Sequence, residues 1–198
     1  MDIICVTNKK TAEKNSVDFY TRIEEIAKTA PEKIILREKY LSDSEYELVA
    51  EKCFDICHKY GVDFVVNKFI NVAENLNIKN IHLSFNDFSE RKKELSFFEC
   101  TGVSVHSVRE ARDAEKNGAG YIIAGHIFPT DCKKGVPPRG TGFLQEVLEN
   151  VSIPVYAIGG INSANVSEVK KTSVSGVCLM SSLMGREAPQ NVMAGIRK

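Results

Sequence analysis

Residues 101–128 read TGVSVHSVREARDAEKNGAGYIIAGHIF, and this stretch contains one complete strand–helix–strand unit. The short apolar run Thr101–His106 is followed by a helical segment, Ser107–Asn117, and by a second apolar run, Tyr121–Phe128. Such runs are typical of strands that are buried on both faces of a parallel sheet. The unit therefore predicts two parallel strands that are joined by a right-handed helical crossover.

The same unit repeats along the rest of the chain. Six further short runs that are rich in valine and isoleucine predict strands, at Ile3–Thr7, Lys33–Arg37, Asp63–Asn67, Asn80–Ser84, Pro154–Ile158 and Gly176–Met180. The clearest helical segment between them, Ser44–Tyr60, is expected to bury a face that carries Leu48, Val49, Cys53, Ile56 and Cys57. Ser107 and Glu110 have the spacing of a capping box at the start of the other clear helix.

Eight strand–helix units with right-handed crossovers predict a compact (β/α)8 TIM barrel that occupies residues 1–198 as a single domain. An open, doubly wound sheet is the alternative, but eight repeats in a chain of 198 residues fit a barrel with minimal loops better. Because this length is at the lower limit for a barrel, one or two helices should be short.

Composition excludes several classes of protein. Lys plus Arg and Asp plus Glu both total 26, so the net charge is zero and nucleic acid is not expected as a partner. No apolar stretch approaches the roughly 20 residues of a membrane span. Met1–Val6 lacks the basic start and the long apolar run of a signal peptide, so we expect a cytoplasmic protein with six reduced cysteines and no metal motif among them.

The active groups of such barrels lie at the carboxyl ends of the strands. Gly159-Gly160 follows the seventh predicted strand and Met180-Ser181 closes the eighth, where barrels often bind phosphate through backbone N–H groups. A tight turn with no ligand is the simpler interpretation of the two glycines. His126 opens a polar loop with two lysines after the sixth strand, and its imidazole suits acid–base chemistry unless backbone groups occupy both ring nitrogens.

Seven motifs in order resemble the thiamine phosphate synthase superfamily over nearly the whole chain. They are Leu36-Arg37-Glu38-Lys39, Val66-Asn67, His82-Leu83 with Asp87, Gly102 to Ser107, the loop from Gly125 to Gly135, Ala157 to Ile161, and Met180-Ser181. The resemblance implies one of two activities. A synthase joins an aminopyrimidine diphosphate to a thiazole phosphate and uses Mg²⁺ held by carboxylates, whereas a thiazole tautomerase only aromatises a carboxythiazole phosphate.

Departures from the synthase pattern lead us to expect the tautomerase. Ile35 stands where the synthases have Gln, Lys68 replaces a metal-binding Asp, and Asp87 alone is a weak Mg²⁺ site. The loop that contains His126 and Cys132 is similar to the tautomerase form. We therefore expect an isomerase of thiamine biosynthesis, without metal or cofactor, whose partner is a small phosphorylated thiazole and which could form a homodimer.

The resemblance assigns His126 to a proton shift from the ring C2 to the exocyclic carbon. Arg37, Lys39 and Lys133 are candidates for the substrate carboxylate, and Lys68 could place an ammonium where the synthases hold Mg²⁺. The remaining predicted substrate-binding residues are Asn67, Ser104, Thr130, Cys132, Gly159, Gly160, Met180 and Ser181.

Three alternatives stay open at this point. The chain could be a Mg²⁺-dependent thiamine phosphate synthase that works with an altered metal site. It could also be a non-catalytic regulator that binds a thiazole or thiamine metabolite, although it lacks a basic patch or a DNA-binding appendage. A phosphosugar isomerase barrel would share the phosphate site but would leave the loop after the sixth strand unexplained.

Overall fold

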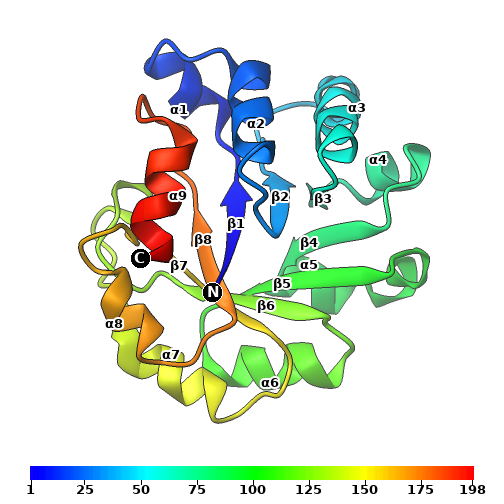
Figure 1. The fold of residues 1–198 in the computed structure, drawn as a ribbon. Helices are drawn as coiled ribbons and strands as arrows, with labels where there is room; N and C mark the ends of the chain where they lie inside the picture. The colour runs from blue at the N-terminus through cyan, green and yellow to red at the C-terminus, as the bar shows by residue number, and fades with distance from the viewer.

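Eight strands alternate with helices along residues 1–198, which the computed structural model describes in full (Figure 1). The strands are β1 (Asp2–Val6), β2 (Lys33–Leu36), β3 (Asp63–Asn67), β4 (Asn80–Ser84), β5 (Cys100–Val105), β6 (Tyr121–Gly125), β7 (Val155–Ile158) and β8 (Gly176–Leu179). The α-helices are α1 (Lys9–Lys14), α2 (Phe19–Ala27), α3 (Asp43–Lys59), α4 (Ile70–Asn75), α5 (Phe85–Glu90), α6 (Val108–Lys116), α7 (Gly140–Leu148), α8 (Val166–Lys170) and α9 (Pro189–Arg197). Two 3₁₀ segments, η1 (Lys92–Phe97) and η2 (Asp131–Lys133), complete the chain.

The strands form a closed barrel in sequence order. Each strand pairs in parallel with the next, and β8 returns to pair with β1, so that Ile4 lies opposite Cys178 and Cys5 opposite Leu179. The expectation of a (β/α)8 barrel is confirmed, and the open-sheet alternative is wrong because no strand is left at an edge. Short helices, such as the five residues of α8, fit eight units into this chain.

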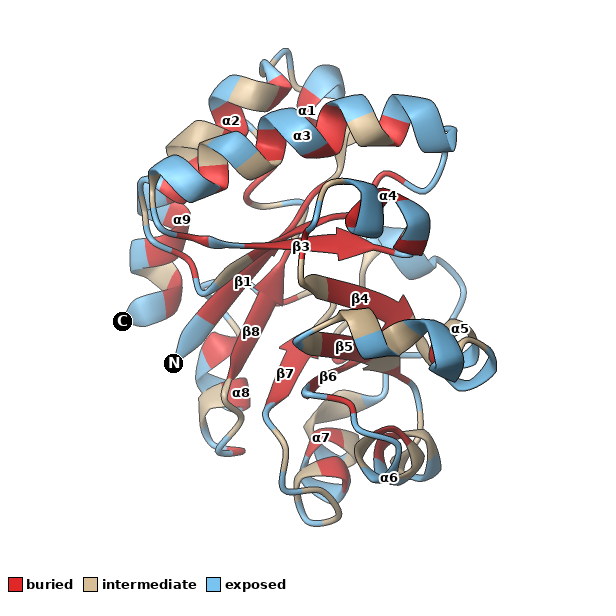
Figure 2. Ribbon diagram, turned by 90° about the vertical axis from the view of Figure 1, so that its right-hand side faces the viewer, coloured by how far each residue is buried: buried red, intermediate tan, exposed pale blue.

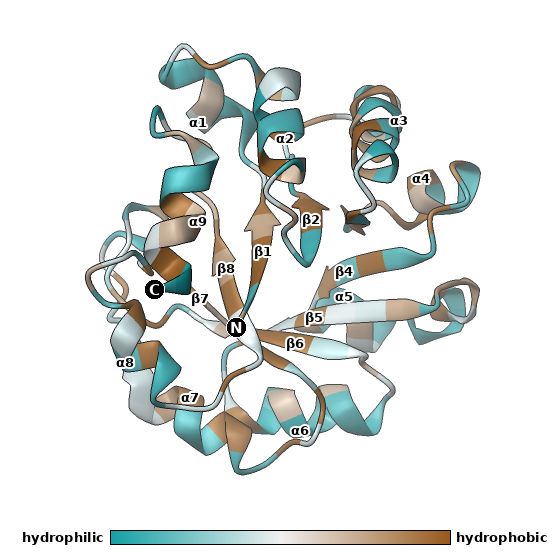
Figure 3. Ribbon diagram, in the orientation of Figure 1, coloured by the Kyte–Doolittle hydropathy of each residue, from teal (hydrophilic) through white to brown (hydrophobic).

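Alternation along the strands produces two apolar layers. In β1, Ile3 and Cys5 face the surrounding helices, whereas Ile4 and Val6 face the barrel interior. The strands are buried almost throughout, and the helices expose only their outer faces (Figure 2). Hydropathy follows the same division, with apolar residues along the strands and polar ones on the outward side of the helices (Figure 3).

Serine side chains cap the starts of α3 and α6. Ser42 and Glu45 form a full capping box at α3. At α6 the Ser107 hydroxyl accepts from the Glu110 N–H at 3.1 Å, but the Glu110 carboxylate accepts from the His106 N–H at 2.6 Å. The expected box at α6 is therefore only half formed, because the acidic side chain reaches one residue further back.

The sixth strand is shorter than expected. Tyr121–Phe128 was the predicted range, but β6 ends at Gly125. Beyond it the chain crosses toward the loop after β7, where the Ile127 N–H donates to the Ile158 carbonyl at 2.9 Å and the Phe128 N–H to the Gly159 carbonyl at 3.0 Å. The other predicted strands agree with the structure to within one residue at each end.

The buried face of α3 contains Val49, Cys53 and Cys57 as predicted, and Ile56 is partly buried against the core. The core residues of the helix are Tyr46, Val49, Ala50, Cys53 and Cys57. Leu48, which was expected on this face, is 63% exposed. It lies two residues from Tyr46, a rotation of about 200° around the helix axis, and so projects to the opposite side. No helix is both long and apolar enough to cross a membrane.

Replacing Gly102 with alanine should destabilise the fold. A Cβ at this position would overlap the ring of Tyr121 inside the barrel. We expect the free energy of unfolding to fall by about 1–3 kcal/mol, measured by chemical denaturation. Gly142→Ala is the control, because nothing lies within 4 Å of its added Cβ and it occupies a helix. Its stability should stay the same or rise by up to about 1 kcal/mol, and an equal loss in both variants would contradict the packing argument.

Candidate functional site

Cationic side chains gather at the carboxyl end of the barrel. The pKa of the Lys39 ammonium is lowered, first by partial burial and then by the Arg37 guanidinium that follows β2. The ammonium groups of Lys68, after β3, and Lys133, after β6, act in the same direction, whereas the Asp87 carboxylate opposes them. Four cations from three loops therefore gather near the partly exposed Asp87 carboxylate and the buried Glu38 carboxyl group, and the excess of positive charge makes the mouth attractive to a polyanion.

A buried carboxyl group supports the two cations after β2. Glu38 is 1% exposed and accepts from the Thr7 hydroxyl at 2.6 Å and the Lys9 N–H at 2.9 Å. The Arg37 N–H in turn donates to the Thr7 hydroxyl at 2.9 Å, so the ends of β1 and β2 are tied together. Burial raises the pKa of the Glu38 carboxyl, although its hydrogen bonds lower it in part.

Asn67 presents an unpartnered oxygen at the end of β3. The side chain is 4% exposed, and its amide nitrogen donates to the His82 carbonyl at 2.9 Å. Its backbone N–H donates to the Tyr46 hydroxyl at 3.0 Å. The Oδ1 atom is buried without a partner. Since buried polar atoms are rarely left unpaired, this oxygen is suited to accept from a substrate.

Ser104 reaches the mouth from β5 and is held from inside the barrel. Its hydroxyl lies 2.8 Å from Nε2 of His82, and Nδ1 of His82 lies 3.2 Å from the hydroxyl of Tyr121. Ser104 is partly exposed, whereas His82 and Tyr121 are buried. The serine is therefore the mouth end of a polar chain that begins in the barrel interior.

His126 is occupied by the loop that follows it. The side chain is 7% exposed, and its Nε2 lies 3.2 Å from the Val136 carbonyl. The His126 carbonyl accepts from the Arg139 N–H at 2.9 Å. These contacts hold both ends of an exposed loop that carries Thr130, Cys132 and Lys133. The loop backbone is therefore placed to occupy one ring nitrogen, whereas the structural interpretation weighed for this histidine required backbone partners at both.

The two glycines after β7 pack against the start of that loop. Gly159 has a φ of +104° and Gly160 a φ of +68°, a conformation that side chains rarely adopt. A Cβ on Gly159 would overlap His126, and one on Gly160 would overlap the Pro129 carbonyl. The glycines therefore bring the loops after β6 and β7 into close contact, beyond making a tight turn.

The segment after β8 contributes a single helical turn in place of a helix. The Met184 N–H donates to the Met180 carbonyl at 3.0 Å, and Ser181 is exposed at the start of this turn. The backbone of Met180 and Ser181 is thus accessible at the same end of the barrel as the glycines. A phosphate group between the two loops remains the prediction for this side of the mouth.

The residues at the mouth do not fit a protein-held Mg²⁺ ion. No group of three His, Cys, Asp or Glu side chains is placed to hold a metal. Asp87 is the carboxylate at the mouth, and one of its oxygens accepts from the Ser84 hydroxyl at 2.6 Å. The ammonium groups of Lys39 and Lys68 lie in the same region and oppose a further cation.

Two supporting residues were missed in the sequence analysis. Glu38 was quoted only as part of a motif, and its position between Arg37 and Lys39 at a strand end was the available signal. Tyr121 was assigned to a strand without a role. Its contact with His82 spans 39 residues of sequence, so no local pattern could reveal it.

Comparisons with known proteins agree with each other. A family model described as thiamine monophosphate synthase matches residues 3–183. A thiamine-phosphate synthase of Pyrococcus horikoshii is 37% identical over 166 residues, which cover 83% of this chain and 80% of that protein. The one of Fusobacterium nucleatum is 32% identical over 198 residues, covering 99% and 95%. The structure of thiamine phosphate pyrophosphorylase from Pyrococcus furiosus matches with a TM-score of 0.83 and 28% identity, covering 99% of this chain and 93% of that one.

These relatives overturn the expected isomerase. Proteins that are 32% to 37% identical are named as synthases, which are transferases, so the thiazole tautomerase assignment is wrong. The proton shift through His126 was part of that assignment and is withdrawn with it. The departures at Ile35 and Lys68 do not place the chain outside the thiamine monophosphate synthase family, whose model matches residues 3–183.

Glu38→Gln should change how stability depends on pH. The folded-state pKa of Glu38 is raised above the ordinary value of 4.5, so the protonated carboxyl adds stability that is lost as the pH rises through the raised pKa. Above pH 4.5 the variant should therefore gain on the wild type, by at most about 1.4 kcal/mol per pH unit, in denaturation curves recorded between pH 4 and 8.

Glu45→Gln is the matched control. Hydrogen bonds from Ser42 lower the pKa of Glu45, so this carboxylate adds stability at neutral pH that is lost as the pH falls. The difference between this variant and the wild type should slope in the opposite direction. Identical slopes for the two variants would show that burial does not control Glu38.

Proposed function

Because the chain belongs to the thiamine monophosphate synthase family, we propose that it is a thiamine-phosphate synthase. In this reaction an aminopyrimidine diphosphate and a thiazole phosphate are joined. The thiazole ring nitrogen forms a bond to the exocyclic carbon of the pyrimidine. The bond from that carbon to the diphosphate oxygen breaks, and inorganic pyrophosphate leaves with the electron pair.

The observation that carries the proposal is the gathering of four cations at the mouth. Arg37 and Lys39 follow β2, Lys68 follows β3 and Lys133 follows β6, and the other three cations and the Asp87 carboxylate lie near enough to Lys39 for their charges to shift its pKa. Negative charge grows on the diphosphate as its bond to carbon breaks. Fixed cations stabilise that charge, and most strongly where water is excluded.

The other predicted residues divide between the two substrates. Gly159, Gly160, Met180 and Ser181 offer backbone N–H groups to the phosphate arm of the thiazole, at the ends of β7 and β8, and β8 is separated from β2 by β1 alone. Asn67 and Ser104 present an acceptor and a hydroxyl to the pyrimidine. Thr130 and Cys132 lie on the exposed loop with Lys133 and complete the proposed set.

Formation of thiamine phosphate from the two substrates tests the proposal directly. The reaction is followed by release of pyrophosphate, with Mg²⁺ in one series and EDTA in the other. We expect product in at least one series at a rate well above the reaction without protein. No product in either series would overturn the proposal.

Lys39→Ala should weaken binding of the diphosphate substrate. A hydrogen bond to a charged group is worth about 1.5–3 kcal/mol, so KM for this substrate should rise roughly 10- to 100-fold. The KM for the thiazole phosphate should change far less. Lys116→Ala, at the exposed end of α6, removes the same charge away from the mouth and should leave both values unchanged. Equal effects of the two variants would remove Lys39 from the site.

Lys68→Asp should make pyrophosphate binding depend on Mg²⁺. The substitution exchanges a cation at the mouth for a second carboxylate beside Asp87. Calorimetry with inorganic pyrophosphate should show binding by the wild type in EDTA. The variant should lose roughly 10-fold or more in affinity in EDTA and recover part of it with Mg²⁺. Equal affinity of both proteins in EDTA would show that Lys68 does not contribute to the anion site.

A further inference from the structure

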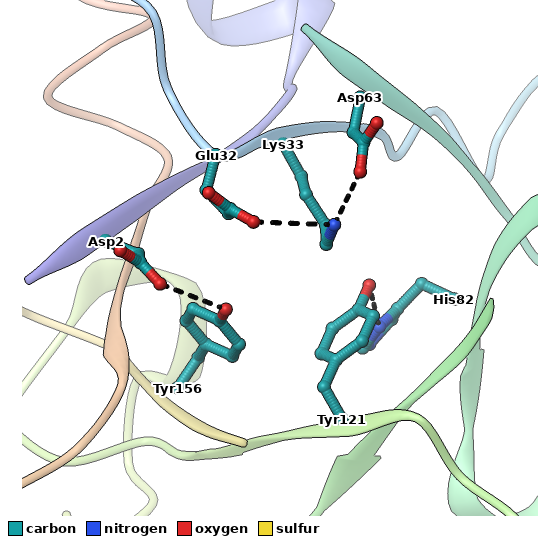
Figure 4. Close-up of polar contacts among 7 residues, drawn as sticks. All are labelled: Asp2, Glu32, Lys33, Asp63, His82, Tyr121 and Tyr156. Carbon is teal, nitrogen blue, oxygen red and sulfur yellow. Dashed lines mark hydrogen bonds and ion pairs between the residues drawn. The ribbon is translucent and has the colours of Figure 1, made fainter. Parts of the chain in front are cut away.

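A chain of three polar groups crosses the barrel interior below the mouth. The Tyr121 hydroxyl, on β6, lies 3.2 Å from Nδ1 of His82, on β4. The Nε2 atom of the same ring lies 2.8 Å from the Ser104 hydroxyl, on β5. Figure 4 shows Tyr121 and His82 facing one another in the interior, beside Tyr156. The chain is continuous from a buried phenol to a partly exposed serine.

The histidine in the middle of the chain is neutral. Burial, and then the positive charges of Lys39 and Arg37, lower the pKa of His82 to about 3. A neutral imidazole carries a proton on one nitrogen and accepts on the other. Both of its partners are hydroxyl groups, which can donate or accept. The direction of the chain therefore depends on which hydroxyl must donate.

Tyr121 has one partner for its proton. The residue is 3% exposed, it packs among apolar side chains such as Ile123 and Cys178, and burial raises the pKa of its phenol well above the usual value. Nδ1 of His82 is the polar atom within hydrogen-bonding distance of its hydroxyl. If that nitrogen carried the proton, the phenol O–H would be buried without an acceptor, which native structures rarely allow.

We propose that Tyr121 is a positioning residue, which donates to Nδ1 of His82 and so fixes the proton of the ring on Nε2. The Nε2–H group then donates to the Ser104 oxygen. The hydrogen of the Ser104 hydroxyl is left without a partner inside the barrel and is directed to the mouth. Ser104 is thereby set as a hydrogen-bond donor to an acceptor atom of the substrate, which on the proposed function is the aminopyrimidine diphosphate.

The first test is independent of any activity. Nitrogen-15 NMR distinguishes the protonated from the bare nitrogen of a neutral imidazole, and His82→Gln assigns its signals. We expect Nδ1 to be bare and Nε2 to be protonated in the wild type. In Tyr121→Phe, Nδ1 loses its donor, and the ring signals should move toward a mixture of the two forms. A wild-type ring that is protonated on Nδ1 would overturn the proposal.

Tyr156→Phe is the matched control. Tyr156, on β7, packs edge-to-face against Tyr121 with ring centroids 5.7 Å apart, but its hydroxyl lies 3.4 Å from Asp2, toward the amino end of the barrel (Figure 4). The Tyr156→Phe variant loses a phenol oxygen, as Tyr121→Phe does, but from a ring whose hydroxyl does not contact His82. Both the His82 signals and the activity should match the wild type. A similar change in both variants would indicate a packing effect and overturn the proposed role.

The second test measures turnover and rests on the proposed function. Tyr121→Phe should lower kcat roughly 10-fold, which is the order of effect expected for one hydrogen bond. Ser104→Ala should lower it further, and adding Tyr121→Phe to that variant should then cause no additional loss, since both act through one hydroxyl. Additive losses would overturn the proposal. A protein with the expected ring signals but no synthase activity would instead refute the proposed function and leave the hydrogen-bond direction standing.

Discussion

Pairing between β8 and β1 joins the two ends of the sheet, and the arrangement of the site follows from it. Because Asp2–Cys5 pair in register with Gly176–Leu179, every strand has two neighbours and all carboxyl ends meet at one mouth. Loops that are distant in sequence, such as those after β2 and β6, are therefore brought over the same small area. The chemistry of the mouth depends on which side chains those few loop positions carry.

The barrel interior adds a second layer of control. Side chains that alternate inward fill it with apolar groups near β1 and with a polar chain between β4, β5 and β6. Gly102 leaves room for the Tyr121 ring, which in turn places its hydroxyl beside His82. The Ser104 hydroxyl at the mouth is thus held through His82 by Tyr121 in the barrel interior. A change in interior packing at Gly102 would therefore also move a polar group that contacts His82.

Periodicity in the sequence predicted the strands well, since each is a short apolar run bounded by turn residues. β3 and β4 have the predicted limits, and β6 is shorter because the following residues leave the sheet to pack on Gly159. The prediction that Leu48 is buried on α3 was wrong. The helix has more apolar residues than one face can bury, and the position of the neighbouring elements decides which of them are buried. Because the strand ends were predicted correctly, the candidate residues that follow them could be assigned to the carboxyl end of the barrel.

The reaction was the part that the sequence did not predict correctly. Single departures such as Lys68 were weighed as the loss of a metal site, whereas an ammonium group can also supply positive charge to a diphosphate. The roles of Glu38 and His82 depend on partners that are 31 and 39 residues away, Thr7 and Tyr121. Such pairings exist only after folding.

The four cations at the mouth have a consequence for the molecule as a whole. The chain has 26 basic and 26 acidic residues, so the positive charge of these four side chains is offset elsewhere in the molecule, and a net charge of zero coexists with a cationic mouth. An approaching polyanion is attracted to this mouth, although the net charge of the protein is zero. The rate at which the polyanion binds should therefore fall as the salt concentration rises, because the screening length is already only about 10 Å at 0.1 M salt.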